Sequence, residues 1–172
     1  MSISIRRATV DDVPRILAGI RGLADYERLA HEVRADESRL RDTLFGAHPA
    51  AEVLLADVDG AAAGFALFFH TYSTFLAQRG LYLEDLYVEP SMRGRGVGRR
   101  LLGALAAIAR QRDCGRLEWS VLDWNTPAIG FYRALGAVPM DEWTVFRVTG
   151  EALDRLAAEG GNPPGTSGIV AV

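Results

Sequence analysis

Residues 81–99 read LYLEDLYVEPSMRGRGVGR, and the order of elements in this segment is the strongest indication of the fold. Residues 81–88 form a mainly apolar run of strand length, rich in leucine, tyrosine and valine, which predicts a β-strand. A glycine-rich turn follows it. From Val97 to about Arg112, apolar residues then recur at helical spacing, which predicts a long amphipathic helix. The order strand, glycine-rich loop and helix raises the question of what the loop binds.

The loop has the composition of an anion site. Three glycines lack a Cβ, so their backbone N–H groups can approach a bound group closely. The helix that follows adds the positive end of its dipole, which favours phosphate. Three arginines add charge nearby. These six residues are Arg93, Gly94, Arg95, Gly96, Gly98 and Arg99. The alternative interpretation is a glycine-rich turn that caps the helix and binds nothing.

Two common phosphate-binding motifs do not fit this loop. A P-loop requires lysine and then serine or threonine after its last glycine, whereas Gly98 is followed by Arg99 and Arg100. The dinucleotide pattern requires a glycine where Arg99 stands. The spacing Arg-x-x-Gly-x-Gly over residues 93–98 instead resembles the pyrophosphate loop of GNAT acetyltransferases.

The rest of the chain predicts further strands and helices. In the first half we expect a strand at 3–7, a helix from Thr9 to about Tyr26, and a second helix after Ala35. Asp59-Gly60 between the apolar runs 52–57 and 61–70 predicts a hairpin, and Gly64 indicates a bulge or a close backbone approach. The later expectations are a loop at 71–80, a strand at 116–122, a helix at 125–135 stopped by Gly136, a strand at 143–148 and a helix at 151–158.

Composition limits the class of protein. The chain has 172 residues with 49% hydrophobic content, which suits one domain, expected at 1–159 with a Gly/Pro-rich tail at 160–172. A net charge of −3 argues against a broad nucleic-acid surface. With no signal peptide and no membrane-spanning run, we expect a soluble, cytoplasmic protein. The single cysteine, Cys114, is interpreted as a small buried residue and not as a nucleophile.

Four blocks in order resemble the diamine N-acetyltransferases, namely the spermidine/spermine and thialysine N-acetyltransferases of the GNAT superfamily. The blocks are residues 81–88, 93–98, 121–125 (VLDWN) and 131–137 (FYRALGA), with LADYE at 23–27 in support. Polyamine members carry an acidic residue and a tryptophan before the Leu-Glu-Asp strand. This chain has Tyr-Ser-Thr-Phe at 72–75, which is closer to the thialysine branch. The resemblance implies an α/β GNAT fold, a mixed central β-sheet with helices on both faces, acetyl-CoA as cosubstrate, no metal and a homodimer.

The resemblance also implies roles for matching residues. Tyr132 would be the general acid, and Glu84 would bind the amine or relay its proton. The implied contacts to acetyl-CoA are Leu86, Tyr87, Val88, Arg93, Gly94, Arg95, Gly96, Val97, Gly98, Arg99, Asn125, Thr126, Pro127 and Ala128. The residues expected to bind the amine substrate are Tyr26, Glu27, Glu84, Asp85 and Glu142.

The chemistry of these residue types is consistent with those roles. An ammonium must lose a proton before it attacks, and a carboxylate such as Glu84 can accept or relay it. A strand N–H near Leu86 can donate to the oxyanion of the intermediate. On residues alone, Tyr132 beside Phe131 is also typical of a core pair, and Asn125 of a simple helix N-cap.

The sequence therefore predicts transfer of an acetyl group to the primary amine of a small basic molecule, by direct attack in a ternary complex. The amine would be a diamine, a polyamine or a lysine analogue. Two alternatives remain open. One is an acetyltransferase acting on a protein N-terminus or lysine, and the other is a non-catalytic acyl-CoA-binding module.

Overall fold

The computed structural model describes residues 1–161. One compact unit spans Met1–Ser120, and a second begins at Val121. The strands are β1 (Ile3–Arg7), β2 (Glu52–Val58), β3 (Ala61–Ser73), β4 (Gln78–Val88) and β5 (Leu117–Trp119). The α-helices are α1 (Val13–Glu27), α2 (Glu37–Phe45), α3 (Val97–Gln111), α4 (Thr126–Ala134) and α5 (Gly150–Glu159). Short 3-10 turns are η1 (Val10–Asp12), η2 (Ala30–Glu32) and η3 (Pro90–Met92).

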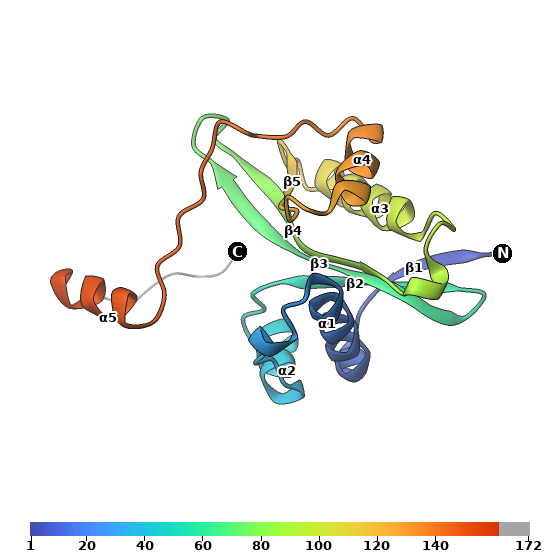
Figure 1. Ribbon diagram of the computed structural model, residues 1–172, viewed down its shortest axis with the longest axis horizontal. Helices are drawn as coiled ribbons and strands as arrows, with labels where there is room; N and C mark the ends of the chain where they lie inside the picture. Colours follow the sequence, from blue (N-terminus) through green and yellow to red (C-terminus); the bar gives the residue numbers. More distant parts are fainter. Residues whose placement is uncertain (162–172) are drawn as a thin grey trace. The chain divides into compact units, whose positions relative to one another are not determined.

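The first unit is built on a mixed five-stranded sheet in the order β1-β2-β3-β4-β5 (Figure 1). The first four strands pair antiparallel. The last pair, β4 and β5, is parallel and runs only from Leu81↔Leu117 to Leu83↔Trp119. Because β4 continues to Val88, its last five residues extend beyond the pairing with β5. The predicted mixed sheet is confirmed, and it opens between these two strands.

The predicted hairpin between β2 and β3 is confirmed. Its turn residues Asp59 and Gly60 both have positive φ, 48° and 83°, as a two-residue turn of this kind requires. The glycine in β3 is explained by a close backbone approach, since a Cβ built at Gly64 would lie 2.3 Å from the carbonyl oxygen of Tyr87. Gly64 therefore lets β3 and β4 pack against each other at the end of β4.

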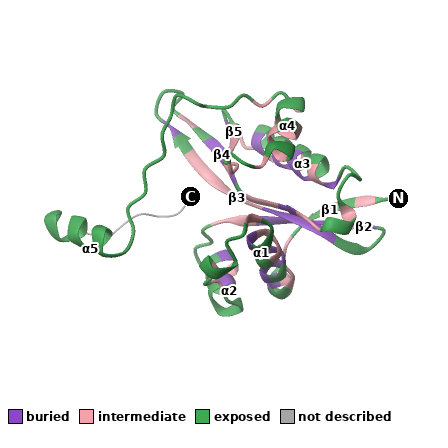
Figure 2. Ribbon diagram, in the orientation of Figure 1, coloured by how far each residue is buried: buried purple, intermediate pink, exposed green. Residues whose placement is uncertain are grey.

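Helices cover both faces of this sheet, as predicted. Figure 1 shows α1 and α2 on one face and α3 on the other, and Figure 2 shows buried residues concentrated between these layers. The core beneath α1 and α2 consists of Val13, Ile16, Leu17, Leu40, Leu44, Val53, Leu55, Phe65 and Tyr87. On the other face, α3 buries Val97, Leu101, Leu102, Leu105 and Ala109. Within residues 1–161, no helix is both long and apolar enough to cross a bilayer.

An ion-pair cluster fixes the residue that ends α3 to the sheet. The Arg112 guanidinium donates to both carboxylate oxygens of Glu52 on β2, with the Nη2···Oε2 bond at 2.8 Å. The arginine holds the pKa of Glu52 below its usual value. Burial lowers the pKa of the neighbouring His70, and the positive charge of Arg112 lowers it further. The helix that begins at the glycine-rich loop is thus anchored to β2 at its C-terminal end.

Three sequence predictions need correction. The loop expected at 71–80 is mostly strand, because β3 runs to Ser73 and β4 begins at Gln78, which leaves a four-residue turn. The strand expected at 116–122 is shortened to Leu117–Trp119. The strand expected at 143–148 is wrong, since these residues form no strand in the structure. Its composition suits a strand, but a strand requires a hydrogen-bonded partner, and none pairs with it among residues 1–161.

Two later predictions are confirmed. The short helix expected at 151–158 is α5. Gly136 ends α4 with φ 86°, and the N–H groups of Gly136 and Ala137 donate to the carbonyls of Arg133 and Tyr132. Of the tail expected at 160–172, residues 162–172 lie outside the described chain.

Candidate active site

A β-bulge in β4 lies at the centre of the site. Leu67 of β3 pairs with Asp85, but the next residue, Phe68, pairs with Leu83, so Glu84 is an extra residue without a cross-strand partner. Opposite residues in an antiparallel pair share a face. Leu67 packs on the core beneath α1, whereas Phe68 lies near Arg112 at the end of α3. Leu83 and Asp85 therefore face opposite sides of the sheet.

The bulge gives the two adjacent carboxylates different surroundings. In a regular strand the adjacent side chains of Glu84 and Asp85 would point to opposite faces, and the bulge interrupts that alternation here. Glu84 is exposed, while Asp85 is half-buried on the α1 face. Burial raises the pKa of Asp85 to about 6, and the negative charges of Glu84 and Glu27 contribute to the increase. Burial also raises the pKa of Glu27, the last residue of α1.

These three residues form a carboxylate cluster, comprising Glu27, Glu84 and Asp85. Two elements far apart in sequence, the end of α1 and the bulge of β4, bring Glu27 and Glu84 near enough to Asp85 to raise its pKa. A cluster of carboxylates in partly buried surroundings attracts a cation, because neighbouring negative charges repel one another and a cation relieves that repulsion. An ammonium group is the type of ligand that would relieve this repulsion.

The glycine-rich loop has the geometry expected for an anion site. Gly94 and Gly96 have positive φ, 72° and 84°, and a Cβ built at either would meet nothing within 4 Å. Gly96 is the N-cap of α3, so no side chain caps the first N–H groups of that helix. Uncapped N–H groups and the helix dipole favour an anion at this position. Arg95 and Arg99 are exposed beside it.

The edge of β4 connects this loop to the carboxylate cluster. Residues 84–88 run from the bulge to the loop, beyond the point where β5 pairs with β4. Leu86 and Val88 are partly buried, whereas the Tyr87 side chain lies in the core beneath α1 and its hydroxyl donates to Glu89 at 3.2 Å. An extended group can therefore bind along this edge by hydrogen bonds to the backbone.

Within the second unit, α4 carries the other predicted residues. Asn125 is its N-cap, and the side-chain oxygen accepts from the Ala128 N–H at 3.4 Å. Ala128 and Tyr132 follow at spacings of three and four residues, so all three lie on one face of the helix. The rings of Phe131 and Tyr132 are 5.4 Å apart. Thr126 and Pro127 are exposed in the first turn, and Glu142 is exposed beyond the helix.

The structure thus groups the predicted residues in two sets. The first unit brings together the glycine-rich loop, the β4 edge and the three carboxylates. The second unit aligns Asn125, Ala128 and Tyr132 on one helix face. Sequence reasoning missed one contact, in which the Arg93 guanidinium lies over the Tyr26 ring, 4.6 Å from Cζ to the ring centroid. No local pattern joins residues 67 positions apart, so this contact could not be predicted from the sequence.

Comparison with known proteins identifies the class. Residues 20–137 match the acetyltransferase (GNAT) family, a class of acyl-group transferases. The chain belongs to this family of acetyltransferases, whose members use acetyl-CoA as cosubstrate.

Relatives agree with this assignment. The chain is 38% identical over 168 residues to the thialysine N-epsilon-acetyltransferase of Bos taurus, covering 91% of this chain and 98% of that protein. It is 35% identical to the L-ornithine N5-acetyltransferase of Arabidopsis thaliana, and the match covers 88% of this chain and 86% of that protein. Among solved structures, an integron cassette protein from the mobile metagenome of V. cholerae aligns with a TM-score of 0.77 and 28% identity, over 91% of this chain and 98% of that one.

Proposed function

We propose that this acetyltransferase moves the acetyl group of acetyl-CoA to the primary amine of a small basic molecule. The observation that carries the proposal is the arrangement along β4. The edge of β4 that extends beyond the pairing with β5 runs from the glycine-rich loop, which has the geometry of an anion site, to the carboxylate cluster. An acyl-CoA needs the first two features, and a cationic amine needs the third. A binding module for acyl-CoA alone would not need the carboxylates.

The loop and the strand edge are proposed to bind acetyl-CoA. Its pyrophosphate would bind the N–H groups from Gly94 to Gly98, with Arg95 and Arg99 adding positive charge. Its pantetheine arm would lie along the backbone of Leu86, Tyr87 and Val88. The fit rests on the positive φ of Gly94 and Gly96 and on the open space around them.

The carboxylate cluster is proposed to bind the amine and remove its proton. Glu84, exposed at the bulge, accepts a proton from the substrate ammonium directly or through water. The neutral amine then attacks the thioester carbonyl, and a backbone N–H near Leu86 donates to the oxyanion that forms. When the C–S bond breaks, the departing thiolate takes a proton from the Tyr132 hydroxyl. The attacking nitrogen loses its second proton through water to the resulting phenolate, which leaves the amide and restores the phenol. No covalent enzyme intermediate is required.

The substrate class follows from charge and from the relatives. The two named relatives act on thialysine and on ornithine, as their names state. A short basic molecule with a free amine suits the cluster of Glu27, Glu84 and Asp85, because its charge is neutralised there. We therefore propose that the substrate is a lysine analogue or a short diamine, in preference to a long polyamine.

The test is acetyl-CoA turnover, followed as free thiol, against thialysine, ornithine, lysine, putrescine, spermidine and a basic peptide. We expect selective turnover of one short amine, and a fall in kcat of about a hundredfold or more in Tyr132→Phe if the phenol is the acid. Phe131→Leu serves as the matched control for loss of an aromatic ring on the same helix. Turnover of the peptide alone would move the assignment to a protein acetyltransferase.

We also propose that the protein is a homodimer. Support comes from large apolar side chains between residues 138 and 156 that are more than half exposed in one chain, namely Val138, Met140, Trp143, Val145, Phe146, Leu153 and Leu156. A segment that exposes this many large apolar side chains is typical of an interface. Light scattering on a sizing column is expected to give twice the 18.7 kDa chain mass. A single-chain mass at micromolar concentration would remove the proposal.

A further inference from the structure

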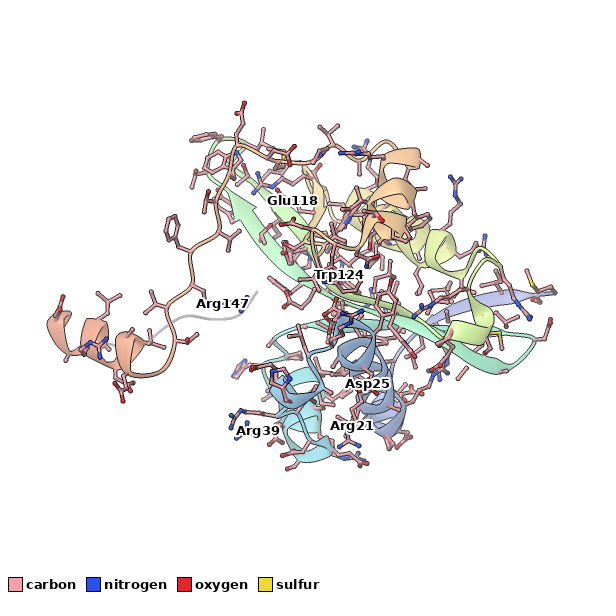
Figure 3. All side chains as sticks on the ribbon, viewed as in Figure 1. Arg21, Asp25, Arg39, Glu118, Trp124 and Arg147 are labelled. Carbon is pink, nitrogen blue, oxygen red and sulfur yellow. The ribbon has the colours of Figure 1, made fainter. Side chains whose placement is uncertain are left out.

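Arg93 joins the glycine-rich loop to the end of α1. Its Nε–H donates to the carbonyl oxygen of Val88 at 3.0 Å, and its guanidinium carbon lies 4.6 Å from the centroid of the Tyr26 ring. Tyr26 belongs to the last turn of α1, between Asp25 and Glu27, and Figure 3 labels Asp25 on this helix. One side chain therefore contacts both the free edge of β4 and the helix that carries part of the carboxylate cluster.

The sequence of α1 explains why this contact forms. Positions 19, 22 and 26 lie on one helix face. A Cβ at Gly19 would lie 2.6 Å from the Phe65 ring, and one at Gly22 would lie 2.5 Å from the Tyr87 hydroxyl oxygen. The two glycines thus let rings from the sheet fill this face. Following this face toward the C-terminal end of α1, position 26 is the next one after the two glycines. It carries an aromatic side chain, Tyr26, and that ring contacts Arg93.

The turn after β4 explains the position of Arg93. Proline begins the 3-10 turn η3, and the Met92 N–H donates to the Glu89 carbonyl at 2.8 Å. This turn brings the chain back toward the end of β4, so that Arg93 can reach the Val88 carbonyl five residues before it. Only Nε–H is used in that bond, and a guanidinium carries further N–H groups at its Nη nitrogens.

We propose that Arg93 is a positioning residue that couples acetyl-CoA binding to the position of the end of α1, which carries Glu27 of the carboxylate cluster, through its contact with Tyr26. This inference rests on the proposed function. A guanidinium is planar and rigid, so a phosphate bound at Nη also fixes the face that contacts the Tyr26 ring. Tyr26 in turn is adjacent to Glu27 of the carboxylate cluster.

Coupling of this kind is reciprocal. If bound phosphate orders Arg93 against Tyr26, then removing the Tyr26 ring must weaken CoA binding, even where the ring makes no contact with CoA. A contact between a guanidinium and an aromatic face depends on the ring and not on the hydroxyl. Tyr26→Phe therefore preserves the coupling, and Tyr26→Leu removes it.

The experiment measures CoA affinity by titration calorimetry in four variants. We expect Tyr26→Leu to weaken CoA binding about fivefold and Tyr26→Phe to leave it unchanged, because the ring is the contacted group. In an Arg93→Met background, Tyr26→Leu is expected to have no further effect. Tyr72→Leu, at an exposed tyrosine on β3, is the matched control, and thermal melting confirms that each variant is folded.

Unchanged CoA affinity in Tyr26→Leu would overturn the inference, and so would effects of Arg93→Met and Tyr26→Leu that simply add. A second measurement concerns the amine, whose KM is expected to rise in Tyr26→Leu more than kcat falls. The CoA titration needs no amine and no turnover. Failure of every amine to be acetylated would therefore refute the proposed function while the titration still decides the role of Arg93.

Discussion

At the residue scale, the most informative side chain is Asp85. Carboxylates in an apolar strand are costly to bury, and the structure adds that Asp85 is half-buried on the α1 face near Glu27 and Glu84. Glu27 is 58 positions away, so its part could not be predicted from a local pattern. Arg93 was predicted from a motif, but its contact with Tyr26 depends on how α1 crosses the sheet.

The raised pKa of Asp85 predicts a specific pH dependence of stability. Its folded-state pKa of about 6 lies above the ordinary value of 3.8, so the protonated form is favoured in the folded protein. The associated stabilisation is complete below the unfolded pKa and is lost as the pH rises through about 6. Relative to Asp85→Asn, the free energy of unfolding of the wild type should fall between these two values.

Urea denaturation at a series of pH values measures this difference. Asp123→Asn replaces an exposed carboxylate and is the matched control, for which we expect a profile parallel to that of the wild type. A gap between wild type and Asp85→Asn that stays constant across the whole range would contradict the assignment of a raised pKa to this residue.

At the element scale, local sequence signals predicted the β2–β3 hairpin, the long helix α3 and the stop of α4 at Gly136. Each of these depends on residues close together in the chain. The strand expected at 143–148 failed because its partner is not encoded locally, and the bulge at Glu84 was missed because it is a mismatch in length between two strands. The pairing partners of the strands and the register of their pairing therefore could not be predicted from the sequence.

The close approach of β3 and β4 can be tested with a pair of glycine substitutions. Gly64→Ala places a Cβ 2.3 Å from the Tyr87 carbonyl oxygen, and we expect it to lower the free energy of unfolding by about 1–3 kcal/mol because neither backbone can shift freely. Gly103→Ala meets nothing within 4 Å on α3 and should raise it by about 0.5–1 kcal/mol through helix propensity. Chemical denaturation measures the free energy of unfolding of both variants. Changes of the same sign in the two variants would contradict the explanation.

At the scale of the whole molecule, packing and predicted chemistry are distributed unequally along the chain. Every buried residue among 1–161 lies in the first unit, and the last of them is Cys114. The predicted general acid, Tyr132, lies in the second. The sequence predicted one domain over 1–159, and no composition shift near residue 120 indicated where the first compact unit ends.

A truncated chain of residues 1–120 separates the two properties. We expect it to unfold cooperatively in a thermal melt followed by circular dichroism, since it keeps the sheet and both helical layers. We expect acetyl transfer to be lost, because Asn125 and Tyr132 are removed. A fragment that melts without a cooperative transition would mean that the second unit is required for the fold, and one that retains turnover would exclude Tyr132 as the acid.

The bulge at Glu84 also has a genetic consequence. Because Glu84 is the surplus residue, loss of its single codon would leave Leu83 opposite Phe68 and Asp85 opposite Leu67, so every other cross-strand partner would be retained. Loss of a codon from the middle of a regular strand instead moves the side chains beyond it to the wrong face. Glu84 is thus a position that this sheet can omit without changing its pairing. A lineage that needs the fold but not the carboxylate can lose Glu84 through deletion of this one codon.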